Sequence, residues 1–151
     1  MVTLSPIGVV KNSRKVVEDD KWGPVVSVIE LGSTINEEAL FQIEEFSHAE
    51  IFYYFHLVEE NKIEMGARHP RNNKDWPIVG IFAQRGKNRP NRLGATMVKV
   101  IKREGSQLFV QGLDAVDGTP VLDIKPVMKE FLPREEVHQP EWATELMKNY
   151  W

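Results

Sequence analysis

Seven short runs of aliphatic, β-branched and aromatic residues, each bounded by turn residues, dominate the hydrophobic pattern of the chain. Val, Ile, Phe and Tyr in short runs, with Gly, Pro, Asn or Asp after roughly every ten residues, are typical of antiparallel β structure. We therefore predict a mostly β fold with an antiparallel sheet or barrel. The predicted strands are residues 6–12, 22–31, 48–58, 77–84, 95–103, 106–116 and 120–127.

Helical patterns are few. Asn36 is a suitable cap for a helix over residues 37–45, which has a modest apolar face. A second short helix is expected near Pro133, and a third, weaker one from Pro140 through Met147. No tract rich in Pro, Gly or Ser divides the chain. We expect a single domain of residues 1–151, with a core barrel over about residues 1–130 and a C-terminal docking tail over about 131–151.

The last ten residues are unusually apolar for a chain end. They include Trp142, Leu146, Met147, Tyr150 and Trp151. Large apolar groups at a terminus usually dock onto a surface, so two alternatives are open. The tail packs on its own barrel, or it docks across the interface of a homodimer.

Positive charge is concentrated in one part of an acidic chain. The formal net charge is −3, from 19 Lys and Arg and 22 Asp and Glu. Residues 68–103 hold ten of the basic residues and one acid, Asp75, a balance of +9, so the remainder carries nine bases and 21 acids, a balance of −12. Such a split favours a site for phosphates or a polyanion on one face. The alternative is a solvated loop whose charges pair with the acidic remainder after folding.

Composition excludes several classes of protein. There is no cysteine, which excludes disulfides, thiolate metal sites and thiol nucleophiles and favours a cytoplasmic location. No apolar run approaches the ~18 residues of a membrane span, and no export signal is evident at the N-terminus. The four histidines have no metal-binding spacing, and no phosphate-binding or dinucleotide-binding glycine motif occurs. We expect no metal and no membrane association.

Two segments carry the candidate chemistry. The first, GIFAQRGKNRPNRLG at residues 80–94, places Arg85, Lys87, Arg89 and Arg92 in one loop. Like charges this dense repel one another unless an anion binds among them. The second, GLDAVDGTPVLDIKP at residues 112–126, has a turn at residues 117–120. Turn chemistry alone explains this segment, but such a turn can also present backbone groups to a polar ligand.

Together with FSHAEIFYYFH at residues 46–56, these segments resemble, in the same order, the signature segments of the TsaA-like (TrmO) family of tRNA adenine-N6-methyltransferases. The resemblance covers residues 6–126 and implies a dimeric antiparallel β-barrel that binds S-adenosyl-L-methionine as methyl donor. It places the donor contacts at His56, Leu57, Arg85, Ala95, Asp117, Gly118, Thr119 and Pro120. Arg89, Pro90 and Asn91 match the family's RPN element beside that pocket. From the positive charge of the loop we expect RNA contacts by Lys87, Arg89, Asn91 and Arg92, while no catalytic residue is assigned.

Two departures from the family pattern concern the substrate. Gly86, Lys87 and Asn88 replace the usual Ser-Pro that precedes the RPN element, and Arg92 replaces a proline. The usual N-terminal PRQ donor contact is missing, and Trp22 and Ser27 are candidates to replace it. We expect N6-methylation of a modified adenosine beside the tRNA anticodon. The alternatives are methylation of a small molecule or another RNA, and a non-catalytic barrel that binds the donor or RNA.

Aromatic residues are candidates for stacking on an unpaired base. They are Phe52, Tyr53, Tyr54 and Trp76, each of which is also a candidate core residue.

Overall fold

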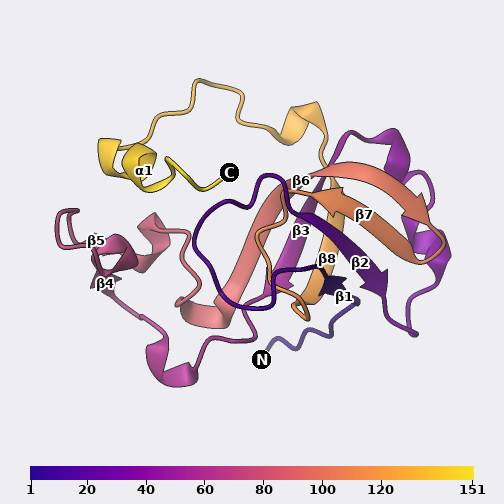
Figure 1. The fold of residues 1–151 in the computed structure, drawn as a ribbon, viewed down its shortest axis with the longest axis horizontal. Helices are drawn as coiled ribbons and strands as arrows, with labels where there is room; N and C mark the ends of the chain where they lie inside the picture. Colours follow the sequence, from indigo (N-terminus) through magenta and orange to yellow (C-terminus); the bar gives the residue numbers. More distant parts are fainter.

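The structure is a computed structural model that describes residues 1–151, and its centre is a closed six-stranded barrel (Figure 1). The strand order around the barrel is β1-β2-β7-β6-β3-β8, and every neighbouring pair is antiparallel. The prediction of a mostly β fold built as an antiparallel barrel is confirmed. The barrel strands are β1 (Gly8–Lys11), β2 (Val26–Leu31), β3 (His48–Tyr54), β6 (Leu93–Glu104), β7 (Gln107–Gln111) and β8 (Pro120–Pro126).

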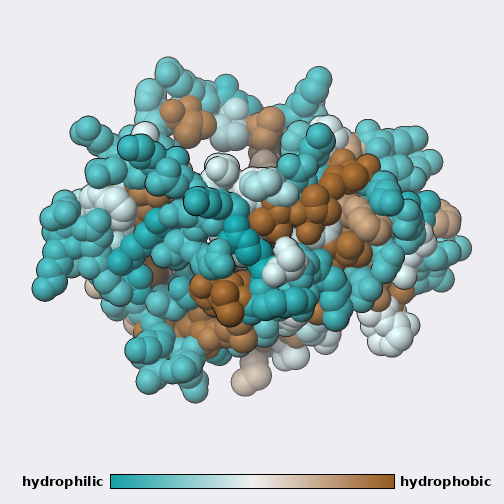
Figure 2. All heavy atoms as spheres, in the orientation of Figure 1, coloured by the Kyte–Doolittle hydropathy of each residue, from teal (hydrophilic) through white to brown (hydrophobic).

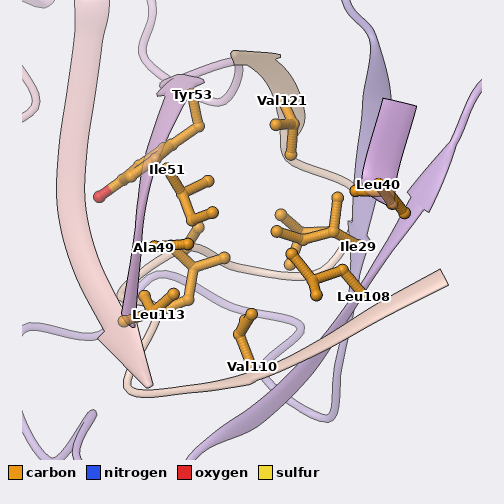
Figure 3. Packing of buried hydrophobic residues seen from close by; sticks show 12 residues of the cluster. Ile29, Leu40, Ala49, Ile51, Tyr53, Leu108, Val110, Leu113 and Val121 are labelled. Atoms are coloured by element: carbon orange, nitrogen blue, oxygen red, sulfur yellow. The ribbon is translucent and has the colours of Figure 1, made fainter. Parts of the chain in front are cut away.

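Alternate residues of the strands point into the barrel and form one hydrophobic core. In β3, Ala49, Ile51 and Tyr53 are buried, whereas their neighbours are partly buried or exposed. Figure 3 shows these side chains facing Ile29 and Val121 across the barrel. Closure of the sheet leaves no unpaired strand edge in the barrel. The other members of the buried cluster are Val10, Leu40, Val98, Leu108, Val110, Leu113 and Ala115.

Gly94, at the start of β6, lies against the ring of Tyr53. A Cβ atom at position 94 would lie 2.5 Å from the Cε2 and Cζ atoms of Tyr53. Real side chains do not approach this closely, so only glycine leaves room for the ring. Gly94 therefore allows the phenol of Tyr53 to lie inside the barrel.

The long connection between β3 and β6 carries the basic loop outside the barrel. It contains two paired short strands, β4 (Ala67–Arg68) and β5 (Val79–Gly80). It also contains four 3-10 helices: η3 (Glu60–Lys62), η4 (Pro70–Asn72), η5 (Ile81–Ala83) and η6 (Pro90–Arg92). The predicted strand over residues 77–84 is wrong for most of its length. Only Val79–Gly80 forms a strand, because the chain turns at Ile81, whose carbonyl accepts a hydrogen bond from the Gln84 amide at 3.2 Å.

The helix predicted over residues 37–45 is replaced by two 3-10 turns, η1 (Glu37–Leu40) and η2 (Ile43–Glu45). Asn36 does cap the first, and its Oδ1 atom accepts from the Glu38 amide at 2.9 Å. Gln42 has φ 68° in the left-handed region, and this interrupts the helix.

The C-terminal part agrees only in part with the predicted helices. The helix predicted near Pro133 is present only as the short 3-10 helix η7 (Lys129–Phe131), which ends before the proline. The third predicted helix is present as α1 (Glu141–Leu146), which begins directly after Pro140.

The C-terminal tail runs back over the barrel and contacts its own chain (Figure 1). The Lys21 amide donates to the Asn149 carbonyl at 3.0 Å, and the Trp22 amide donates to the Tyr150 carbonyl at 2.8 Å. Gly23 lies against the last residue of the chain. A Cβ atom at position 23 would be 2.9 Å from the carbonyl carbon of Trp151. The tail therefore packs beside the segment that leads into β2.

The surface is mainly polar with separate apolar patches, as Figure 2 shows for one face. Exposed large apolar side chains include Met65, Ile78, Phe82 and Phe131. None of the helices combines the length and the hydrophobicity that crossing a membrane requires.

Candidate functional site

The barrel topology brings the predicted donor-binding residues to one end. β3 runs between β6 and β8, and both neighbours are antiparallel to it. The residues that follow the C-terminal end of β3 are therefore next to the first residues of β6 and β8. His56 and Leu57 follow β3, Ala95 lies near the start of β6, and Pro120 begins β8. Segments that are far apart in the sequence thus meet at this end of the barrel.

Gly118 and His56 are adjacent in space. A Cβ atom at Gly118 would lie 3.8 Å from the Nε2 atom of His56. Gly118 also has φ +84°, a conformation that glycine adopts without strain. The turn at residues 117–120 therefore passes close to the imidazole, and the absence of a side chain keeps this approach open.

His56 is only partly buried, and its burial lowers the pKa of its imidazole below the ordinary value of 6.5. The ring is therefore uncharged at neutral pH. Leu57, next in the chain, is 54% exposed, although leucine is usually buried. Neither side chain therefore adds a positive charge to this end of the barrel.

Backbone amides of the turn are all bonded within the chain. The amides of Asp117, Gly118 and Thr119 donate to the carbonyls of Arg14, Val10 and Val116, at 2.7, 2.7 and 3.2 Å. The Thr119 hydroxyl is buried and donates to the Val116 carbonyl at 2.7 Å. A ligand at this turn would meet its carbonyl groups and its surface, not free amides.

The carboxylate of Asp117 also has partners in its own chain. Its Oδ2 atom lies 2.8 Å from Lys15 Nζ, and its Oδ1 atom accepts from the Asn12 amide at 2.9 Å. The Lys15 side chain and the Asn12 amide together lower the pKa of Asp117. Asp117 is therefore ionised at neutral pH and anchors the segment that contains Asn12 to the turn.

Arg85 connects the basic loop to β6. Its Nη2 atom donates to the carbonyl of Ala95, so two of the predicted donor contacts touch each other. The residue is otherwise exposed, and no carboxylate lies within 4.0 Å of it. The guanidinium keeps donors that can bind a ligand carboxylate or phosphate.

Two further cations of the basic loop, Arg89 and Arg92, are held by backbone carbonyls. Arg89 Nη1 donates to the Gln84 carbonyl at 2.7 Å, and Arg92 Nη1 donates to the Val58 carbonyl at 2.9 Å. Asn91 has φ 63°, as the third residue of a turn closed by the Arg92 amide and the Arg89 carbonyl at 3.0 Å. No hydrogen bond or ion pair holds the ammonium of Lys87. The six ion pairs of the structure include none of these four cations, so folding leaves their charge uncompensated.

A partly buried polar cluster around Asp114 was not predicted from the sequence. Asp114 Oδ1 accepts from the Tyr53 hydroxyl at 2.9 Å and from the Thr96 hydroxyl, and Oδ2 accepts from the Tyr150 hydroxyl. Burial, and then the negative charge of Asp114, raise the pKa of Tyr53 and of Tyr150. The charge of Arg85 opposes both shifts, which places the cluster near the candidate site.

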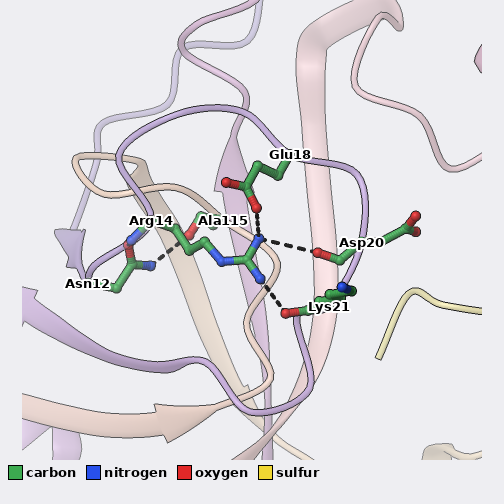
Figure 4. Close-up of polar contacts among 6 residues, drawn as sticks. All are labelled: Asn12, Arg14, Glu18, Asp20, Lys21 and Ala115. Atoms are coloured by element: carbon green, nitrogen blue, oxygen red, sulfur yellow. Dashed lines mark hydrogen bonds and ion pairs between the residues drawn. The ribbon is translucent and has the colours of Figure 1, made fainter.

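The segment before β2 is organised by two polar side chains (Figure 4). Asn12 Nδ2 donates to the Ala115 carbonyl at 2.8 Å, and Arg14 Nη1 donates to Glu18 Oε2 at 2.6 Å. Arg14 also lies 4.5 Å over the ring of Trp22, which is 3% exposed. Ser27 is fully buried and accepts from Asn12 Nδ2 at 2.9 Å. Trp22 and Ser27 therefore have structural partners and present little surface to a ligand.

The aromatic residues proposed for base stacking have partners in the structure. Tyr53 is buried, and Tyr54 lies under Arg92, 5.2 Å from the guanidinium carbon to the ring centroid. Trp76 Nε1 donates to Glu145 Oε2 at 3.2 Å, and Phe52 is partly buried in β3. None of the four is a freely exposed ring.

An apolar hollow lies away from these residues. It has a volume of ≈ 450 Å³ and is lined mainly by apolar residues near η1 and η2, among them Leu31, Phe41 and Phe46. It contains none of the predicted donor-binding residues. No group of three or more His, Asp or Glu side chains is arranged to hold a metal ion.

The comparisons with known proteins agree on one family. The model of the tRNA-methyltransferase O N-terminal domain matches residues 19–131. A protein of Pyrococcus abyssi, named "probable S-adenosyl-L-methionine-binding protein", is 32% identical over 142 residues, which are 91% of this chain and 74% of that protein. The mouse tRNA (adenine(37)-N6)-methyltransferase is 39% identical over 95 residues, which are 63% of this chain and 22% of that enzyme.

Solved structures agree with the sequence comparison. The crystal structure of TrmO from Pseudomonas aeruginosa superposes with a TM-score of 0.73 at 26% identity, and the match covers 94% of this chain and 62% of that one. The chain thus spans less than a quarter of the length of the mammalian relatives and about three-fifths of the TrmO chain.

Proposed function

Because the chain belongs to the family of the tRNA-methyltransferase O N-terminal domain, we propose that it is an S-adenosyl-L-methionine-dependent methyltransferase that methylates N6 of a modified adenosine next to the tRNA anticodon. The observation that carries the proposal is the meeting of His56, the turn at residues 117–120 and Arg85 at one barrel end, next to a loop with uncompensated positive charge.

The donor is proposed to bind at His56, Leu57, Arg85, Ala95 and the run Asp117 to Pro120. S-adenosyl-L-methionine, when bound, supplies a methyl group on a positively charged sulfur, and this sulfur leaves as a neutral thioether. An uncharged His56 imposes no repulsion on that charge, and Arg85 can bind the donor's carboxylate. Leu57 offers an apolar surface for the adenine ring. The side chains of the site therefore fit the donor.

Positioning supplies most of what the protein must do in this reaction. The leaving group is neutral, so no side chain has to protonate it, and the proton that N6 loses on methylation passes to solvent water. In-line placement of the acceptor nitrogen lowers the barrier. We assign RNA contacts to Lys87, Arg89, Asn91 and Arg92, which follow Arg85 in the same loop. These residues can hold phosphates of a tRNA stem-loop while its adenosine reaches the donor.

The proposal extends to assembly and location. We propose a homodimer, because large apolar side chains are exposed and the family resemblance implies dimers. A tRNA substrate and the absence of cysteine support a cytoplasmic location.

Light scattering before and after deletion of residues 141–151 tests whether a dimer exists and whether the tail contributes to it. The core barrel of residues 1–130 with a docking tail over 131–151 is proposed as one domain.

Mass spectrometry of nucleosides tests the proposed reaction. Purified protein is incubated with S-adenosyl-L-methionine and with tRNA from cells that lack the gene. We expect an N6-methylated adenosine derivative that is absent when either component is omitted. Donor binding without any methylated tRNA nucleoside would contradict the tRNA acceptor and favour a small-molecule acceptor or a binding barrel.

A further inference from the structure

Phe82 is an exposed aromatic side chain directly beside the basic loop. It is 79% exposed, and its ring makes no aromatic or cation–π contact. Only two residues separate it from Arg85 along the chain. Exposure of a whole phenyl ring removes the hydrophobic gain of burying it, so a partner that covers the ring would restore that gain.

The backbone on both sides of Phe82 is fixed. Ile81 is 2% exposed, and its amide donates to the Gly66 carbonyl at 2.9 Å. The side-chain nitrogen of Gln84 donates to the carbonyls of Arg68 and Val79, at 3.0 Å each. Phe82 is therefore held outward on η5 by a buried neighbour and an anchored turn. A ring placed in this way loses little backbone freedom when a ligand covers it.

We propose that Phe82 is a stacking platform for an unpaired base of the RNA substrate, and that the cations of the neighbouring loop bind the phosphates of the same strand. This inference rests on the proposed function and names an additional substrate contact. Single-stranded nucleic acid is bound by the same combination, a positive groove along the backbone with aromatic rings between the charges. Phe82 was not among the aromatic residues predicted from the sequence to stack.

Charge favours RNA over a second copy of the chain as the partner of Phe82. A twofold interface centred on this ring would bring two copies of the basic loop together. Arg85, Lys87, Arg89 and Arg92 have no carboxylate within 4.0 Å, so the two loops would repel each other. An RNA strand covers the ring and compensates the charge at the same time.

The test measures the affinity of two RNA probes for variants of Phe82 and of a second exposed phenylalanine, Phe131. The probes are a synthetic stem-loop with an unpaired loop and a fully paired duplex with the same number of phosphates. Phe82→Ala should weaken binding of the stem-loop about tenfold, which is ~1.4 kcal/mol, and leave duplex binding unchanged, because only the stem-loop offers an unpaired base that stacks on the ring. For the Phe82→Ala variant, the slope of log affinity against log salt should equal that of the wild type, since no charge is removed. Phe82→Trp should retain the affinity.

Phe131→Ala is the matched control. Phe131 is 82% exposed, but it lies on η7, beyond the far end of β8 from the candidate site. We expect no change for this variant with either probe. Equal stem-loop affinity of Phe82→Ala and wild type would overturn the stacking role while leaving the proposed methyltransferase function intact.

Two further outcomes would overturn the stacking role of Phe82. Loss of a dimer in Phe82→Ala by light scattering, with RNA affinity unchanged, would show that a second copy covers the ring and would overturn the proposal. No RNA binding by the wild type, together with normal donor binding, would overturn both the stacking role and the tRNA acceptor. Donor binding is measured for every variant, and unchanged donor affinity shows that the barrel end is intact.

Discussion

The hydroxyl of Tyr150 donates a hydrogen bond to the carboxylate of Asp114, which connects the C-terminal tail to the polar cluster inside the barrel. The same carboxylate accepts from Tyr53 on β3 and Thr96 on β6. Asp114 therefore holds together two barrel strands and the tail, close to the end where the donor is proposed to bind.

Tyr150→Phe should destabilise the protein by about 1.5–3 kcal/mol, the usual range for a hydrogen bond to a charged group. The variant keeps the ring and removes only the donor to Asp114. Urea denaturation measures the change. Tyr54→Phe is the control, because the Tyr54 hydroxyl makes no hydrogen bond while its ring stays under Arg92. Equal stability of the two variants would mean that the tail contact contributes nothing.

Gly23→Ala should displace the tail without substituting any residue of the Asp114 cluster. The added methyl group would lie 2.9 Å from the Trp151 backbone, which cannot move while Lys21 and Trp22 bind Asn149 and Tyr150. We expect faster amide hydrogen exchange over residues 141–151. Gly80→Ala is the control, because nothing lies within 4 Å of a Cβ atom there. Unchanged exchange in Gly23→Ala would contradict docking of the tail on this segment.

His56 should make both stability and donor affinity depend on pH. Burial lowers its folded pKa below 6.5, so the unfolded chain takes up the proton first as the pH falls. The His56 contribution to stability is therefore complete above pH 6.5 and is lost as the pH falls from 6.5 through the folded pKa. A protonated ring would also repel the donor sulfonium.

Calorimetry at about pH 8 and about pH 5.5 checks the binding part of this prediction. Donor affinity of the wild type should fall at the lower pH, and His56→Gln should lose most of this dependence. His138→Gln, in the exposed tail, should behave as the wild type. The same pH dependence in all three proteins would exclude His56 as its source.

Lys87 should contribute to RNA binding through its charge. Its ammonium has no partner in the chain, so Lys87→Ala should lower the slope of log affinity against log salt by roughly one without loss of stability. Arg89→Ala and Arg92→Ala should lower the slope too, and they should also cost stability because their guanidiniums hold backbone carbonyls. Lys129→Ala, on η7, is the control. Equal tRNA affinity and slope for Lys87→Ala and wild type would contradict the role of this residue.

The strand pattern predicted most of the barrel because buried positions alternate, as Ala49, Ile51 and Tyr53 do in β3. It failed at residues 77–84, where the apolar run contains only one buried residue, Ile81, and lies outside the barrel. Amino-acid composition does not distinguish this exposed apolar run from a strand of the barrel. Gln42 likewise separates η1 from η2 through a left-handed backbone, which no residue-type preference predicts for glutamine.

The candidate site was predictable only as separate motifs. The resemblance named His56, Arg85 and Gly118, and the topology of β3, β6 and β8 explains why they share one barrel end. The sequence contained no signal that Tyr150 would reach Asp114, because the contact depends on the path of the whole tail. Phe82 was missed because its hydrophobicity is typical of a core residue, and only the structure places it outside.

Calorimetric titration of the ligand-stripped protein with S-adenosyl-L-methionine tests the central claim most directly, namely that this barrel end holds the methyl donor. We predict one site per chain with a Kd on the order of micromolar, corresponding to about −8 kcal/mol. Arg85→Ala should weaken binding of S-adenosyl-L-methionine at least about tenfold, because it removes the charged N–H groups that are proposed to bind the ligand's carboxylate. No heat and no thermal shift at a donor concentration on the order of millimolar would contradict the account, since a donor that does not bind cannot be used.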